Sequence, residues 1–115
     1  MRTQTYNLVA RLYKQRGYNL KQNVILEGAS GLTQNFHMLA IKPDESHVIQ
    51  VIDWNRTVGV NMVINMDRAA ADVGIKNVVI VAENFSDHAK AYAKRRGLTL
   101  INTRCLLYTS DAADE

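Results

Sequence analysis

The sequence has a single cysteine, Cys105, and a single proline, Pro43, among 115 residues. One cysteine excludes an internal disulfide and any metal site built from clustered thiolates. No run of about 18 apolar residues occurs, and the first residues lack the apolar stretch of a secretory signal, so we expect a cytoplasmic protein with no membrane contact. Aromatic residues make up only 7% of the chain, whereas 47% of it is hydrophobic and 22% is charged, a composition typical of one globular domain.

The last eleven residues, 105–115, match the translation of a transposon-end adapter used in sequencing libraries. We therefore predict a native domain over residues 1–104, with the natural reading frame cut near Arg104 and a native C-terminal piece replaced. The segment 105–115 holds three of the eleven acidic residues and none of the fourteen basic ones. Residues 1–104 consequently have a net charge of +6, which is compatible with a polyanionic partner.

Hydrophobic periodicity predicts an α/β domain with elements in the order α-β-β-β-α-β-α-β. Helices are expected at residues 5–16, 58–73 and 86–96, and strands at residues 18–27, 36–41, 47–53, 77–82 and 98–101. Gly17, Gly74 and Gly97 would end the three helices, and Thr57 and Ser86 would cap the second and third. Short connections between the first three strands favour an antiparallel meander, and the later strand–helix–strand unit favours parallel pairing, giving a mixed central sheet flanked by helices.

Several local motifs follow one another at a recognisable spacing. They are Arg16-Gly17-Tyr18, the turn from Glu27 to Gly31, the segment from Gln50 to Trp54, and Val58-Gly59-Val60. The segments 79–82, 85–89 and 97–101 complete the series. Together, over residues 5–101, they resemble the Mrr branch of the PD-(D/E)xK nucleases. The resemblance implies the restriction-endonuclease-like fold.

The resemblance also implies a catalytic motif, in which this chain departs from the family. The family has an Asp on the second strand and a Glu or Gln on the third, which hold magnesium, and a Lys two residues later. The matching positions here are His37, Gln50 and Ile52, which we call the degenerate motif. Magnesium prefers anionic oxygen ligands, and isoleucine cannot replace a lysine. We therefore predict a nucleic-acid-binding domain, with DNA as partner, impaired catalysis and no cofactor.

Two alternatives stay open. In the first, the chain is an active, magnesium-dependent endodeoxyribonuclease in which Asp53 and Glu27 substitute for the missing carboxylates and Arg56 for the missing cation. In the second, it is a protein-interaction module that kept the fold and lost nucleic acid. The turn from Gly28 to Gly31 could hold a phosphate through backbone N–H groups, but it lacks the Lys-Ser/Thr of a P-loop, so we interpret it as a β-turn.

Basic residues concentrate on two of the predicted helices. Such side chains give salt-dependent affinity for phosphates, although the end of a helix also favours cations for its own stability. A homodimer formed through an exposed sheet edge or through the second helix is compatible with the pattern. The predicted nucleic-acid-binding residues are Lys14 and Arg16 near the first helix, Arg56 after the third strand, and Lys90, Lys94, Arg95 and Arg96 on the third helix.

Overall fold

The computed structural model describes residues 3–52 and 57–103. Along these residues the order of elements is α1 (Thr3–Gln15), β1 (Asn19–Glu27), β2 (Thr33–Lys42), β3 (Glu45–Val51), β4 (Thr57–Val58), α2 (Val60–Asp72), β5 (Asn77–Ala82), β6 (Asn84–Phe85), α3 (Asp87–Arg96) and β7 (Thr99–Asn102). None of the helices in this described part is long and apolar enough to cross a membrane.

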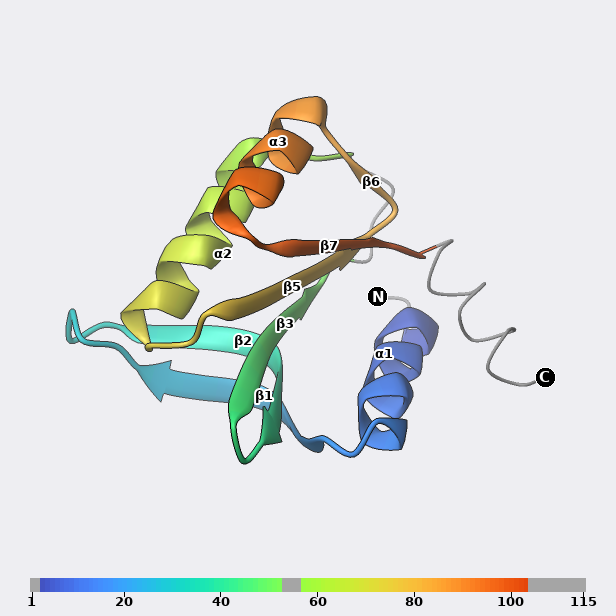
Figure 1. Cartoon of the computed structure of the whole chain (residues 1–115), viewed down its shortest axis with the longest axis vertical. Helices are drawn as coiled ribbons and strands as arrows, with labels where there is room; N and C mark the ends of the chain where they lie inside the picture. The colour runs from blue at the N-terminus through green and yellow to red at the C-terminus, as the bar shows by residue number, and fades with distance from the viewer. Residues whose placement is uncertain (1–2, 53–56, 104–115) are drawn as a thin grey trace.

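The main sheet has the strand order β1-β2-β3-β5-β7. Its first three strands pair antiparallel, whereas β5 pairs parallel with both β3 and β7. Helix α1 covers one face of the sheet, and α2 and α3 cover the other (Figure 1). The predicted meander, the parallel unit and the mixed sheet flanked by helices are therefore confirmed.

Differences from the predicted elements occur mainly at their ends. Thr57 does not cap α2, because it forms the two-residue strand β4, which pairs with β6; Gly59 occupies the N-cap position without a side-chain bond. Such short strands have no periodicity that a sequence could reveal. Ser86 does cap α3, its Oγ accepting the Ala89 N–H at 3.1 Å, and Gly97 ends the helix with a φ of 75°.

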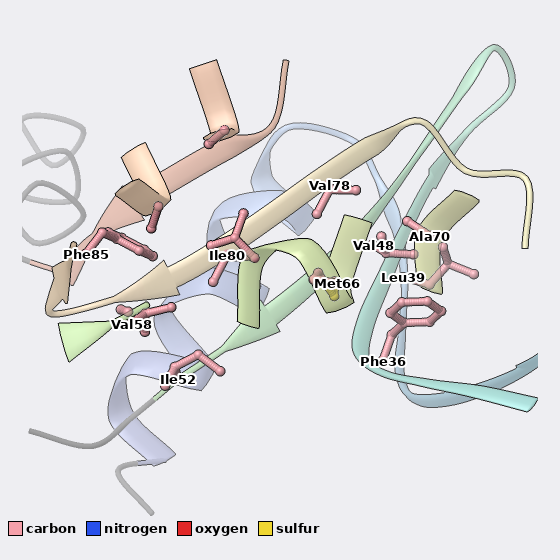
Figure 2. Packing of buried hydrophobic residues seen from close by; sticks show 14 residues of the cluster. Phe36, Leu39, Val48, Ile52, Val58, Met66, Ala70, Val78, Ile80 and Phe85 are labelled. Atoms are coloured by element: carbon pink, nitrogen blue, oxygen red, sulfur yellow. The ribbon is translucent and has the colours of Figure 1, made fainter. Parts of the chain in front are cut away.

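Two apolar clusters fill the two sides of the sheet. The α2-side cluster packs the sheet against α2 and α3 and includes Phe36 and Met66 (Figure 2). The α1-side cluster packs the sheet against α1 and includes Val9, Met38 and Val81. Strand β5 contributes to both clusters, as expected for a strand whose β-branched run is covered on both faces.

The turn between β1 and β2 is fastened to the end of α2 through Asp72. The Ala29 N–H donates to the Asp72 carbonyl at 2.8 Å, and the N–H and hydroxyl of Ser30 donate to the Asp72 carboxylate at 2.9 and 2.7 Å. Gln34 Nε2 donates to the same carboxylate at 3.0 Å, and these hydrogen bonds lower the pKa of Asp72 below 3.8. Because these N–H groups already have acceptors, the turn is not arranged to receive a phosphate.

Gly28 has a specific steric role beside this contact. A Cβ at Gly28 would lie 1.9 Å from Asp72 Oδ2, so the Asp72 carboxylate would have to move and give up its hydrogen bonds. Gly28→Ala is therefore expected to lower the midpoint of thermal unfolding, followed by circular dichroism, by about 4–8 °C. In a protein that already has Asp72→Ala, the Gly28→Ala substitution should lower the midpoint of thermal unfolding little further, since the carboxylate that clashes with the new Cβ is absent. An equal drop in both backgrounds would contradict this role.

Candidate functional site

The degenerate motif begins with a directly hydrogen-bonded pair on neighbouring strands. The backbone N–H of His37, on β2, donates to Gln50 Oε1, on β3, at 3.0 Å. The backbone N–H of Val51 donates in turn to His37 Nδ1 at 3.0 Å. From α1, the Tyr6 hydroxyl donates to the His37 carbonyl at 3.0 Å, and the two rings meet edge-on at 6.3 Å. The structure thus brings His37 and Gln50 into direct contact.

The pair lies where the pattern of the sheet is irregular. Phe36 belongs to the α2-side cluster and Met38 to the α1-side cluster, although residues two apart on a regular strand face the same side. Asn23, at the matching place on β1, has a φ of 53°, in the left-handed region. The backbone N–H of His37 consequently donates to a side chain of β3, that of Gln50, instead of to a backbone carbonyl, which is typical of a bulge-like distortion.

Ile52, the third residue of the motif, belongs to the core. Only 7% of it is exposed, and it packs in the α2-side cluster near Val58 (Figure 2). Its backbone N–H donates to the Val81 carbonyl at 2.7 Å, which fixes the chain against β5. The side chain therefore contributes packing at the position where the resemblance implies a lysine.

The predicted substitute groups do not complete a site among the described residues. Glu27 is exposed and pairs with Thr33 at the far end of the β1–β2 hairpin. Thr33 is four residues from His37 along β2, a distance of roughly 13 Å at the usual rise per residue. Asp53 and Arg56 lie outside the described residues. Glu27 is thus too distant to act together with His37 and Gln50.

The residues of the degenerate motif do not fit magnesium. Gln50 Oε1 already accepts the His37 N–H, and His37 Nδ1 already accepts the Val51 N–H. The three side chains of the motif are a neutral amide, an imidazole and an alkyl group. Magnesium needs several oxygen ligands in near-octahedral geometry. Over residues 3–52 and 57–103, no three His, Cys, Asp or Glu side chains are grouped so that they could hold a metal ion.

The environment of His37 has a consequence for stability. Burial lowers the pKa of His37 below 6.5, and its Nδ1 can accept the Val51 N–H only while it has no proton. The unfolded chain therefore takes up a proton on His37 at a higher pH than the folded chain does. The stabilisation from neutral His37 should therefore be present in full above about pH 6.5. Below that pH, the free energy of unfolding measured with urea should fall as the pH approaches the lowered pKa of His37 in the folded protein.

The His37→Gln variant provides the control for this pH dependence. Glutamine has no titrating proton, so the difference between the two proteins should shrink as the pH falls. The carboxylates of Glu45 and Asp72, whose pKa values are lowered from 4.5 and 3.8, titrate at still lower pH and do not interfere. A pH-independent difference between wild type and variant would show that the ionisation of His37 is not linked to folding.

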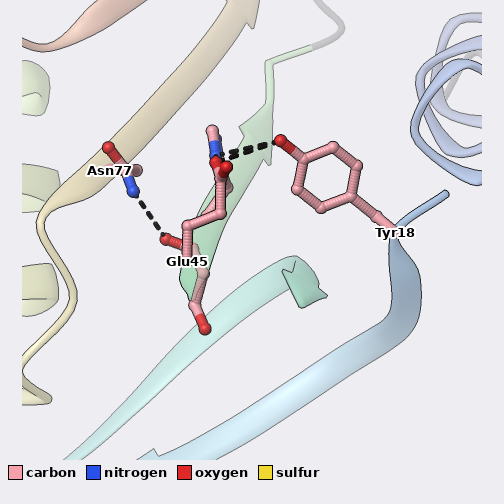
Figure 3. Close-up of polar contacts among 5 residues, drawn as sticks. Tyr18, Glu45 and Asn77 are labelled. Atoms are coloured by element: carbon pink, nitrogen blue, oxygen red, sulfur yellow. Dashed lines mark hydrogen bonds and ion pairs between the residues drawn. The ribbon is translucent and has the colours of Figure 1, made fainter. Parts of the chain in front are cut away.

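A second polar cluster, which the sequence reading missed, lies at the other end of β3. Glu45 Oε2 lies 2.5 Å from His47 Nε2 and accepts the Tyr18 hydroxyl at 3.0 Å (Figure 3). Lys42 Nζ stands 4.3 Å from the centre of the Tyr18 ring. Burial raises the pKa of the adjacent Tyr13 to about 12. The Glu-x-His spacing on a strand, which places both side chains on one face, was the available signal.

This cluster joins strand β3 to Tyr18, and both ring nitrogens of His47 are used or buried within it. Nε2 of His47 is engaged by Glu45, and Nδ1 is buried with no hydrogen-bond partner among the described residues. The contacts tie the start of β3 to Tyr18, which links α1 to β1.

The predicted basic residues fall into two sets on opposite sides of the sheet (Figure 1). Lys14 and Arg16 belong to α1 and the turn after it, whereas Lys90, Lys94, Arg95 and Arg96 belong to α3. All six are exposed. The two sets therefore cannot form one continuous surface.

Arg96 has a structural partner that the sequence did not suggest. Its Nε donates to Asp67 Oδ2 at 3.0 Å, and the Tyr92 hydroxyl donates to the same oxygen at 2.7 Å. Asp67 is only 8% exposed, so these two donors satisfy a buried carboxylate and hold α3 against α2. Arg96 is thus at least partly engaged within the fold.

A hollow on the other side of the sheet, which we call the α1 groove, runs between α1 and β1. It is lined by Asn7, Ala10, Arg11, Lys14 and Gln15 of α1 and by Gln22 of β1. The sequence predicts a role for Lys14 but not for the amide side chains, because the approach of Gln22 to Asn7 and Gln15 depends on how α1 lies over the sheet.

Comparison with known proteins identifies relatives of this arrangement. A family model described as restriction endonuclease, Mrr_cat, matches residues 3–109. No curated protein sequence matches the chain. Among solved structures, AF1548, a protein of unknown function, is similar with a TM-score of 0.75 and 24% identity over 90% of this chain and 64% of that one.

Two further similar structures are a repair endonuclease and a protein solved with double-stranded DNA. A repair endonuclease from Pyrococcus abyssi has a TM-score of 0.64 and 15% identity, over 89% of this chain and 46% of that one. EndoMS in complex with double-stranded DNA has a TM-score of 0.53 and 17% identity, over 84% of this chain and 43% of that one. At these identities the similarity concerns the fold, and the chain spans between 43% and 64% of the length of the three structures.

Proposed function

The chain belongs to the restriction endonuclease family whose model matches residues 3–109, and we propose that it is a DNA-binding domain of this fold in which phosphodiester cleavage has been lost. The partner is the polyanionic backbone of duplex DNA. The domain would hold it through basic side chains, and the degenerate motif would serve only to order the strands beside the interface.

The hydrogen-bonded pair of His37 and Gln50 supports the loss of cleavage most directly. Each of the two side chains uses its acceptor atom on a backbone N–H group of the neighbouring strand. Ile52 is buried in the core and supplies no charge. Metal-assisted hydrolysis requires a metal that activates water and stabilises developing charge, and this set of groups offers neither anionic oxygens nor a free cation.

Two observations support DNA as the partner. Residues 1–104 have a net charge of +6, although charge alone does not separate DNA from other polyanions. The EndoMS structure with which the fold is shared was determined with double-stranded DNA, which motivates the choice of a duplex. Exposed lysines and arginines of such a domain would give affinity without strong base selectivity.

The proposal is tested by measuring binding and cleavage on the same labelled duplex. Fluorescence anisotropy without divalent metal should show binding that weakens about ten-fold or more between about 50 and 200 mM salt. Gel analysis of the same duplex and of supercoiled plasmid, after incubation with magnesium or manganese, should show no cut product. Cleavage that is abolished by Gln50→Leu would establish the active-nuclease alternative, and absence of binding at low salt would favour the protein-interaction module.

A further inference from the structure

The α1 groove has the composition of a surface that receives phosphates. Its lining has two cationic side chains, Arg11 and Lys14, and three amide side chains, Asn7, Gln15 and Gln22, with no carboxylate. Cations attract the backbone of a nucleic acid, and amides donate hydrogen bonds to phosphate and sugar oxygens. All five residues are exposed, so binding would not require the fold to open.

The length of this row of side chains along α1 matches a short stretch of one nucleic-acid strand. Asn7, Arg11, Lys14 and Gln15 follow one another at intervals that place them on one face of α1. From Asn7 to Gln15 the helix rises by roughly 12 Å. Because one strand of a duplex advances by about 3.4 Å per nucleotide, this stripe can accompany about three successive phosphates.

One end of the groove lies beside the contact between α1 and His37. Asn7 directly follows Tyr6, whose hydroxyl donates to the His37 carbonyl at 3.0 Å. His37 is thus the member of the motif that α1 contacts. Gln50 lies between Ile49 and Val51, which belong to the α1-side cluster, so its side chain and that of Ile52 face α2 and not the groove.

The α3 surface lacks these properties. Arg96 is engaged by Asp67, and Asp87 stands in the first turn of the same helix. The three cations of the last turn, Lys94, Arg95 and Arg96, also stabilise the C-terminal end of the helix dipole, which accounts for their position without a ligand.

We propose that the α1 groove, defined by Asn7, Arg11, Lys14, Gln15 and Gln22, is the surface that holds the phosphate backbone of nucleic acid, and that the basic surface of α3 does not take part. This assignment rests on the proposed DNA-binding function and adds the place of binding. It also gives the amide side chains of Asn7 and Gln22 a role as hydrogen-bond donors to the backbone.

The test compares two double variants that remove the same charge. Arg11→Gln with Lys14→Gln alters the α1 groove, and Lys90→Gln with Lys94→Gln alters the opposite side of the sheet. All four side chains are exposed, and each variant removes one cation from the last turn of a helix, Lys14 or Lys94, so any small loss in the midpoint of thermal unfolding should be similar in the two. Binding of the full chain to a labelled duplex is then followed by anisotropy over a range of salt concentrations.

The α1-groove variant should bind about ten-fold more weakly or worse, and the slope of log K against log salt should decrease by about 2, one for each lost phosphate contact. The α3 variant should stay within about two-fold of the wild type. A loss confined to the α3 variant, or equal losses in both, would overturn the assignment while leaving DNA binding intact. Failure of the wild type itself to bind would instead refute the proposed function.

Discussion

Replacing Ile52 by lysine, the residue that the resemblance to the PD-(D/E)xK nucleases implies at this position, is expected to destabilise the domain without restoring cleavage. Ile52 is 7% exposed in the α2-side cluster. Its replacement removes buried apolar surface and places an amine where water is excluded, at a combined expected cost of about 3 kcal/mol in the free energy of unfolding. Urea unfolding followed by circular dichroism measures that cost, and a plasmid assay with magnesium measures cleavage.

Ile52→Val is the matched control for this variant. It removes one methylene group and adds no charge, so it should cost about 1 kcal/mol. Ile52→Lys could instead be as stable as Ile52→Val and cut DNA with magnesium. Position 52 would then be a catalytic position, and the presence of isoleucine there would be what prevents cleavage. That result would contradict the assignment of Ile52 to the core.

Phe36→Ala is expected to cost about 3–5 kcal/mol of unfolding free energy, a large part of the total stability of a domain this size. Phe36 is 2% exposed, and its ring packs among Leu39, Val48 and Ala70 (Figure 2). The same residue anchors β2 immediately before His37. Its loss should therefore loosen the hairpin that positions the degenerate motif.

The neighbouring strand provides a matched control for Phe36. Ile25, on β1, is 67% exposed although it lies in the same hairpin. Ile25→Ala should change the free energy of unfolding by less than about 0.5 kcal/mol, because little apolar surface is lost. Comparable costs for the two truncations, measured by urea unfolding, would show that the hairpin does not dock on α2 through Phe36.

The sequence was sufficient for the elements that have a clear period or a clear stop signal. Glycines 17, 74 and 97 all have positive φ at the ends of helices, where they were expected. The buried β5 strand followed from its run of β-branched residues. Strands β4 and β6 were not predicted, because two residues have no periodicity and because the paired residues are 27 positions apart in the chain.

The site was predictable in part. The positions of His37 and Gln50 on adjacent strands followed from the resemblance, but their hydrogen bonds to backbone groups did not, since these depend on the local irregularity beside Asn23. The α1 groove depends on the placement of a helix over a sheet, which no sequence period specifies. The pairing of Arg96 with Asp67 similarly joins residues 29 positions apart.

Manganese binding tests the central claim most directly, because it asks whether the degenerate motif still holds a divalent metal. The full chain is titrated with Mn²⁺ while the free ion is followed by electron paramagnetic resonance. Our account predicts no site occupied at micromolar metal, and the same result for His37→Gln and Gln50→Leu. One ion bound per chain at micromolar concentration, and lost in both variants, would contradict it and would show that the motif retains the metal chemistry of its family.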